Sequence, residues 1–295
     1  MALTVQTNLS SLTAQRDLSH ANSMNAKSMR NLSSGRSINS AADDPANLQI
    51  SHKFTSQINC LNRGNRNASE GQAVSDLAEG ALAEDFSILQ RIRQLAIQSA
   101  NGTYSQEDRD TMQSEVNKLC NEITRIACKT TYGGSQLLNG KSNGIIDDSG
   151  NLTLQVGSNA NTTISVNLGV SFTMSSLQAH LGGVTDGLGY DAASKTFDVS
   201  SASKAQDVLA NIDNFIEFVD SRRNDLGAVA NRLSSTIKNQ SSMTENESDA
   251  RARIMDTDFA METSKLVQSD IMLNSTNQML MQANARPNIV QSLLS

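Results

Sequence analysis

The sequence contains few aromatic residues and almost no proline. Of its 295 residues, 3% are aromatic and none is Trp. Aromatic rings supply the largest buried areas, and burial stabilises a fold by about 25 cal/mol per Å² of apolar surface, so this composition argues against a compact globule. The two prolines are Pro45 and Pro287, which leaves residues 46–286 without a helix-breaking ring. We therefore expect an elongated, helix-rich chain, or one that completes its burial against copies of itself.

Long apolar runs and concentrated charge are also missing. No apolar run approaches the roughly 18 residues of a membrane span, and residues 1–11 lack a basic region followed by an apolar stretch. We therefore expect neither membrane insertion nor ordinary secretion. The net charge of −6 divides into +3 over residues 1–70 and −3 over each of 71–140, 141–200 and 201–295. The basic residues are scattered among acids, which argues against nucleic-acid binding.

Apolar residues recur at helical spacing in the first half of the chain. A thin stripe over residues 3–34 predicts a helix too polar to be stable alone in water. Asp44 is expected to cap a helix from Pro45 to about Ala100. Ser105 and Asp108 form a capping-box pattern, and the helix that follows carries a coiled-coil seam of Met112, Val116, Leu119, Ile123 and Ile126.

The middle of the chain has a different character. Residues 141–200 are rich in Gly, Ser, Asn and Asp, and two alternating apolar runs within 152–168 predict a β-hairpin. We expect residues 171–202 to form a short variable surface segment. A helical pattern resumes near Ser203, weakens over 240–249 and returns toward the C-terminus. The fold class is thus mainly α, an antiparallel bundle or coiled coil of N- and C-terminal segments with a small central β-hairpin region.

No catalytic pattern is found in the sequence. The three histidines (His20, His52 and His180) are far apart and form no zinc-binding motif. Cys60, Cys120 and Cys128 have no metal-ligand spacing and are interpreted as free thiols. We expect no enzyme activity, metal or cofactor. The methionine-rich tail has two interpretations, core filling or an adaptable partner-binding helix, and it comprises Met255, Met261, Met272, Met279 and Met281.

Several motifs, taken together and in this order, resemble bacterial flagellin. Near the start these are Asn8-Leu9-Ser10-Ser11-Leu12, Leu32-Ser33-Ser34-Gly35 and Asp43-Asp44, and in the middle Ala78-Glu79-Gly80-Ala81-Leu82 and the stretch from Leu89 to Asn101. Near the end they are Asp225-Leu226-Gly227-Ala228-Val229, Arg253-Ile254 with Phe259-Ala260, and Gln282-Ala283-Asn284. The resemblance covers roughly residues 1–170 and 203–295. The chain departs from the family in its three cysteines, and residues 171–200 are far shorter than the outer domains of large flagellins.

The resemblance implies an architecture and a function. Residues 1–44 with 254–295 would form the terminal coiled-coil core, and residues 45–170 with 203–253 the rod-like domain that carries the hairpin. The function implied is that of a structural subunit that polymerises into the helical filament of the bacterial flagellum for motility. A flagellin-like hook–filament junction protein and a self-associating adhesin are the alternatives.

The resemblance also implies particular residues and partners. We expect the polymerisation core to include Val5, Leu9, Leu12, Leu266, Ile271, Leu280, Leu293 and Leu294. The positions that match a Toll-like receptor epitope are Arg91, Leu95 and Glu115. The expected partners are other flagellin copies, hook-associated and filament-cap proteins, a flagellin export chaperone and a Toll-like receptor. The expected location is extracellular, in the flagellar filament, after type III export.

Overall fold

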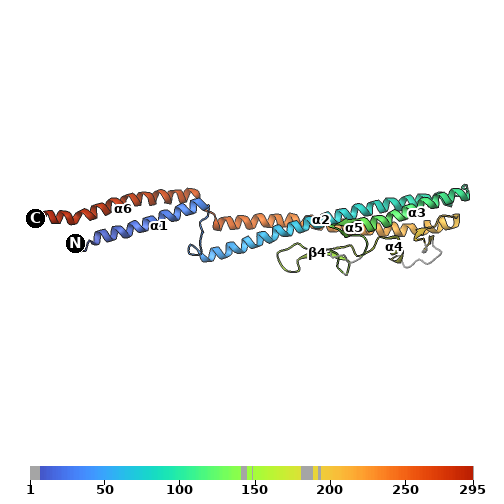
Figure 1. The fold of residues 1–295 in the computed structure, drawn as a ribbon, viewed down its shortest axis with the longest axis horizontal. Coiled ribbons are helices and arrows are strands. Elements are labelled where there is room, and N and C mark those ends of the chain that lie inside the picture. Colours follow the sequence, from blue (N-terminus) through green and yellow to red (C-terminus); the bar gives the residue numbers. More distant parts are fainter. Residues whose placement is uncertain (1–6, 141–144, 148, 181–188, 192–193, 295) are drawn as a thin grey trace. The chain divides into compact units, whose positions relative to one another are not determined.

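The computed structural model describes residues 7–140, 145–147, 149–180, 189–191 and 194–294, although the side chains of His180 and residues 287–294 are not described. The fold is mainly helical, as the sequence predicts (Figure 1). The chain forms two compact units: a terminal unit of residues 1–58 and 245–295, and a rod unit of residues 59–244. The boundaries between units fall within helices α2 (Pro45–Ala100) and α5 (Ala202–Met255). The domain division at residues 44 and 254 that the resemblance implies stays a prediction.

The terminal unit is built on helices α1 (Leu9–Ser34) and α6 (Phe259–Leu294), which lie side by side (Figure 1). They run antiparallel, because Asn8 contacts Ala283 whereas Asn31 contacts Glu262. The expected helix is present as α1 from Leu9 to Ser34, and residues 3–6 of the expected range lie outside the described residues. Asn8 is its N-cap, with the side chain accepting from the Ser11 N–H at 3.1 Å, which satisfies a donor that has no partner inside the helix.

Two short connections next to α1 and α6 pair with each other. Gly35 ends α1 in the left-handed conformation, with φ of 68°, which glycine adopts without steric cost. Beyond it, the Ser37 N–H donates to the Met255 carbonyl at 2.7 Å, and the Thr257 N–H donates to the Gly35 carbonyl at 3.0 Å. Asp44 caps α2 as predicted, because its side chain accepts from the Asn47 N–H at 3.0 Å.

Three long helices form the rod unit: α2, α3 (Gln106–Lys129) and α5. The predicted capping box is confirmed, since Ser105 and Asp108 each accept from the other's backbone N–H. An ion pair of 3.3 Å between Arg93 and Asp213 joins α2 to α5. The apolar seams of the three helices face one another, and their side chains make up the largest core cluster.

Small antiparallel strand pairs flank these helices. Strands β1 (Thr131–Tyr132) and β2 (Ser135–Gln136) pair directly after α3, and β5 (Tyr190–Asp191) pairs with β6 (Thr196–Phe197). The predicted hairpin is confirmed as β3 (Asn151–Gln155) and β4 (Thr163–Asn167), in a register that runs from Asn151↔Asn167 to Gln155↔Thr163. Its inward residues Leu152, Ile164 and Val166 are buried.

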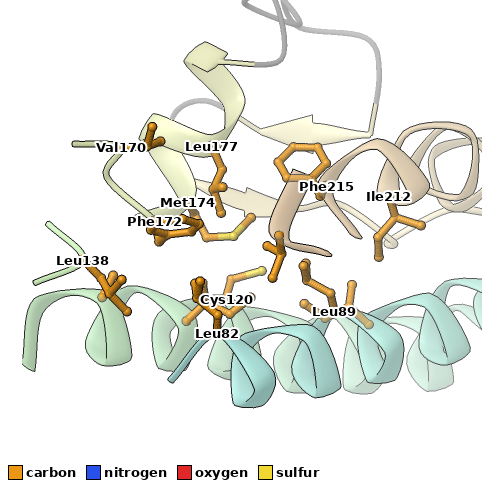
Figure 2. Close-up of a cluster of buried hydrophobic side chains, with 14 of the residues drawn as sticks. Leu82, Leu89, Cys120, Leu138, Val170, Phe172, Met174, Leu177, Ile212 and Phe215 are labelled. Atoms are coloured by element: carbon orange, nitrogen blue, oxygen red, sulfur yellow. The ribbon is translucent and has the colours of Figure 1, made fainter. Parts of the chain in front are cut away.

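The expectation that residues 171–202 form a surface segment is wrong for the described part of that range. The segment folds into helix α4 (Met174–His180) and the β5–β6 hairpin. Figure 2 shows its apolar side chains projecting toward the helices that carry Leu82 and Cys120. The sequence did not predict that this segment contributes to the core of the rod unit. Its apolar residues stand singly among glycines and serines and show no helix or strand periodicity. The buried ones are Phe172, Met174, Leu177, Tyr190, Phe197 and Val199.

Candidate assembly surface

The seam between α1 and α6 is made of small and polar side chains. In the described residues, α1 buries Ser11, Ala14, Ala21, Ser28 and Asn31, and α6 buries Glu262, Ser269 and Ala283. Small side chains let two helices approach closely, but they bury little apolar area. Since burial stabilises by about 25 cal/mol per Å², this seam provides little hydrophobic stabilisation.

Hydrogen bonds align the two helices instead. Asn31 donates to Glu262 at 3.2 Å, and Lys265 forms an ion pair of 3.2 Å with the same carboxylate. Burial of Glu262 opposes its charged form, but hydrogen bonds from Ser28, Lys265 and Asn31 outweigh burial and lower the pKa of Glu262. Buried polar contacts of this kind specify which residues face each other across a helix pair.

The Asn8 end of α1 is fixed to α6 in the same way. The Asn8 side chain donates to the Ala283 carbonyl at 2.7 Å, and the Ser11 hydroxyl donates to the Asn284 side chain at 2.7 Å. Polar contacts therefore connect the two helices both here and at Asn31–Glu262. They hold α1 and α6 in register and leave the larger apolar side chains free to point elsewhere.

Nine large apolar side chains of the two helices are exposed. Leu9 is 67% exposed, Ile271 is 63% exposed and Met281 is 66% exposed. Leu12, Met29, Phe259, Met261, Val267 and Met279 are each more than half exposed as well. We call these nine residues the outer apolar set. They are distributed along both helices, and exposed apolar surface that is contiguous marks interaction sites.

The structure places the predicted polymerisation residues in different environments. Leu9, Leu12 and Ile271 belong to the outer apolar set, whereas Leu266 and Leu280 are half-buried. Val5 and the side chains of Leu293 and Leu294 lie outside the described residues. Sequence reasoning missed Met29, Phe259 and Val267. The outward position of Met261, Met279 and Met281 favours a partner-binding tail over core filling for those residues.

An exposed ion pair between Arg91 and Glu115 joins α2 to α3. The Arg91 Nε and Nη2 atoms donate to Oε1 of Glu115 at 3.0 and 2.8 Å, and both side chains are about half exposed. Leu95 is only 3% exposed and belongs to the rod core. The Leu95 side chain therefore faces the interior of the unit, and its place in a receptor epitope with Arg91 and Glu115 stays a prediction.

The histidine, cysteine and acidic side chains form no metal site in the part of the chain that the structure describes. No cluster there of three or more His, Cys, Asp or Glu side chains could hold a metal ion. Cys60, Cys120 and Cys128 are free thiols. Burial raises the pKa of the Cys120 thiol to about 11, so this thiol is neutral near pH 7 and acts as a small apolar core residue. Among the described helices, none combines the length and apolarity needed to traverse a bilayer.

Comparison with known proteins points to one family. The model of the bacterial flagellin N-terminal helical region matches residues 5–143, and that of the bacterial flagellin C-terminal helical region matches residues 209–294. Flagellin C of Vibrio cholerae serotype O1 is 32% identical over 376 positions, and polar flagellin B/D of Vibrio parahaemolyticus is 34% identical over 377 positions. Each alignment covers 100% of this chain and 100% of the relative.

The fold was also compared with solved structures. The crystal structure of Bacillus cereus flagellin matches with a TM-score of 0.48 and 23% identity, over 59% of this chain and 88% of that one. The sequence alignments with the Vibrio proteins are longer than this chain of 295 residues. Those relatives therefore contain residues that this chain lacks.

Proposed function

This chain belongs to the bacterial flagellin family and is a subunit of the flagellar filament, and on that premise we propose that its outer apolar set is the surface through which copies polymerise. The role is structural, with no catalytic step. The relatives described above carry the name flagellin, which favours a filament subunit over a hook–filament junction protein or an adhesin.

One observation supports this proposal above the others. In the terminal unit, the seam between α1 and α6 is small and polar, while nine large apolar side chains face outward. Burying a Leu, Ile, Phe or Met side chain stabilises by about 1.5–3 kcal/mol. The isolated chain leaves most of this stabilisation unused, and neighbouring copies that cover α1 and α6 would supply it.

Assembly then follows from how the surfaces are arranged. A contact between different surfaces of identical subunits, repeated without closing, generates a helical filament. Because the terminal helices gain most of their burial from neighbours, their full ordering and polymerisation would occur together. The half-buried Leu266 and Leu280 would be covered fully at the same step.

The proposal also includes the proteins that the chain would contact before and after export. The apolar side of α6 suits a flagellin export chaperone, which would cover residues such as Val267 and Ile271 before type III export. After export the chain would lie outside the cell, between hook-associated proteins at one end of the filament and filament-cap proteins at the other. The exposed apolar residues of α6, which a chain in solution must shield, support this proposal.

The polymerisation surface can be tested by making it polar. In Leu12→Gln combined with Ile271→Gln, the critical concentration for filament growth should rise at least tenfold per residue, because about 1.4 kcal/mol of lost burial corresponds to a factor of ten. Seeded growth followed by light scattering and electron microscopy measures this. The helicity of the dilute monomer should stay unchanged, since both side chains are already exposed in it.

A matched control uses exposed polar residues on the same two helices. Gln15→Ala combined with Gln278→Ala changes two outward side chains and should leave the critical concentration within about twofold. Wild-type growth by the Leu12/Ile271 variant would refute the proposal.

The receptor proposal rests on the Arg91–Glu115 pair alone. We expect Arg91→Ala combined with Glu115→Ala to abolish activation of a Toll-like receptor by the monomer. The matched control is Arg93→Ala combined with Asp213→Ala, which removes an equally exposed ion pair from the same unit. Unchanged receptor binding by the Arg91/Glu115 variant would contradict the assignment.

A further inference from the structure

Asp85 is a carboxylic acid in the apolar core of the rod unit. It lies on α2 between Leu82 and Leu89, both fully buried, and is itself 1% exposed. Neither of its carboxyl oxygens has a hydrogen-bond partner among the described residues. Ionising a buried group that has no partner is costly, so this site favours the protonated, neutral acid.

The charges nearest to Asp85 are acidic. After burial, which is the largest cause, Glu122 on α3 and Glu84 on α2 raise the pKa of Asp85 to about 8. Glu122 forms an ion pair of 2.6 Å with Arg125, and Glu84 is exposed. No cation therefore compensates a charge on Asp85 from either helix.

On the α5 wall of the core, Arg222 and Arg223 each form an ion pair with an acid. The ion pairs Arg93–Asp213 and Arg223–Glu79 place α5 residues 213–223 opposite this part of α2. In that stretch Glu217 is exposed, Arg222 lies 3.5 Å from Asp225, and Arg223 lies 3.5 Å from Asp220 in addition to its pair with Glu79. The Arg223 guanidinium lies 5.6 Å from the centre of the Phe86 ring, and its Nε atom is buried without a hydrogen-bond partner among the described residues.

Among its described residues, the segment that covers the helices contributes the buried Tyr190 as a titratable group of this core. Burial, with the thiol of Cys120 and the carboxylate of Asp191 as further causes, raises the pKa of Tyr190 to about 12. Tyr190 and the Cys120 thiol are therefore both neutral at the pH at which Asp85 would ionise.

We propose that the protonation state of Asp85 controls the folding stability of the rod unit. The helices α2 and α3 pack around the neutral acid, and this packing loosens when Asp85 loses its proton. The inference goes beyond assembly, because it concerns the folding of the single chain and does not depend on a filament.

The sign of the pH effect follows from linkage. The ordinary pKa of an Asp is 3.8, and the folded value is about 8. Between these values the folded chain holds a proton that the unfolded chain has released, so rising pH favours unfolding. The contribution of Asp85 is greatest below about pH 4. As the pH rises from about 4 to about 8, the loss of this contribution lowers the folding equilibrium constant by up to about tenfold per pH unit. Above about pH 8 the folding equilibrium constant no longer changes through Asp85.

The test is urea unfolding of the full chain as a dilute monomer, followed by far-UV circular dichroism at each unit from pH 5 to pH 9. Asp85→Leu fits the apolar seam and cannot ionise, and Asp85→Asn is a neutral mimic of similar size. The gap in stability between wild type and Asp85→Leu, expressed as a ratio of folding equilibrium constants, should widen by up to about tenfold per pH unit up to pH 8. The control Asp76→Asn removes an exposed acid of α2 that is not among those raising the pKa of Asp85, and it should follow wild type. Parallel profiles for wild type and both Asp85 variants would overturn the proposal.

A second measurement needs no substitution. Carbon-detected NMR of the Asp85 carboxyl in the wild-type chain should show a midpoint near pH 8. A midpoint below pH 5 would overturn the proposal even if every variant failed to fold.

Discussion

Individual polar side chains decide where the helices of this protein begin. Asn8, Asp44 and Ser105 each accept a backbone N–H from the first turn of the following helix, a donor that would otherwise have no partner. The last two were predictable because they precede a proline or an acidic residue at capping spacing. Asn8 was missed because the leucines before and after it continue the apolar stripe.

The capping box gives the first residue-scale prediction. Ser105→Ala should lower the free energy of unfolding of the rod unit by about 1 kcal/mol, because it leaves the Asp108 N–H without its acceptor. Urea unfolding measures the change. Ser114→Ala, in the exposed middle of the same helix, is the control and should be neutral or slightly stabilising; equal losses in the two variants would argue against a capping role.

Asp43 gives a second prediction, on acid sensitivity. Lys27, at 3.0 Å, and then Ser40 hold the pKa of Asp43 well below its usual range. A group whose folded pKa is lowered stabilises the fold above its unfolded pKa, and this contribution is lost as the pH falls. Helicity of the terminal unit should therefore decrease below about pH 4, and Asp43→Asn should reduce this acid dependence. An acid profile identical to wild type would contradict it.

At the scale of elements, close approach of the β3–β4 hairpin to α2 depends on glycine. A Cβ at Gly64 would collide with the Val156 carbonyl oxygen, and one at Gly71 with the Leu154 side chain, whereas one at Gly80 would meet nothing within 4 Å. All three positions look alike in the sequence as weak points of a long helix. Only the position of the hairpin distinguishes them.

The same substitution should therefore have opposite effects along one helix. Gly64→Ala should destabilise the rod unit by about 1–3 kcal/mol, because the backbone of the hairpin must move. Gly80→Ala should stabilise it by about 0.5–1 kcal/mol, because a glycine inside a helix is replaced by the best helix former. Thermal unfolding of both variants measures the difference. Changes of the same sign would show that the hairpin does not pack as described.

At the scale of the whole molecule, the terminal unit and the rod unit bury their surfaces in different ways. The rod unit has an apolar core, which includes Leu82, Ile123 and Phe197. The terminal unit has a polar seam and leaves the nine side chains of the outer apolar set exposed. The rod unit therefore has its own source of hydrophobic stabilisation, whereas we expect the terminal unit to gain its stabilisation from neighbouring copies.

Truncation tests this division. Removing residues 1–30 or residues 266–295 should leave a soluble, helical rod unit that no longer polymerises, because either deletion removes most of one helix of the terminal pair. Circular dichroism should show retained helix, and seeded electron microscopy should show no filaments. Filaments of normal length from either truncation would contradict the proposed role of the terminal helices.

The sequence by itself determined the long helices, the caps at Asp44 and Ser105, the β3–β4 hairpin and the family, because periodicity and capping are local properties and the flagellin motifs occur in order along the chain. Only the tertiary structure decided which face of each helix is buried. The stripe containing Leu9, Leu12 and Ile271 points outward, since the smaller Ser11, Ala14 and Ser269 allow α1 and α6 to approach. In the same way Leu95, Asp85 and Phe197 became core residues because burial depends on what packs against a side chain, and those partners are distant in sequence.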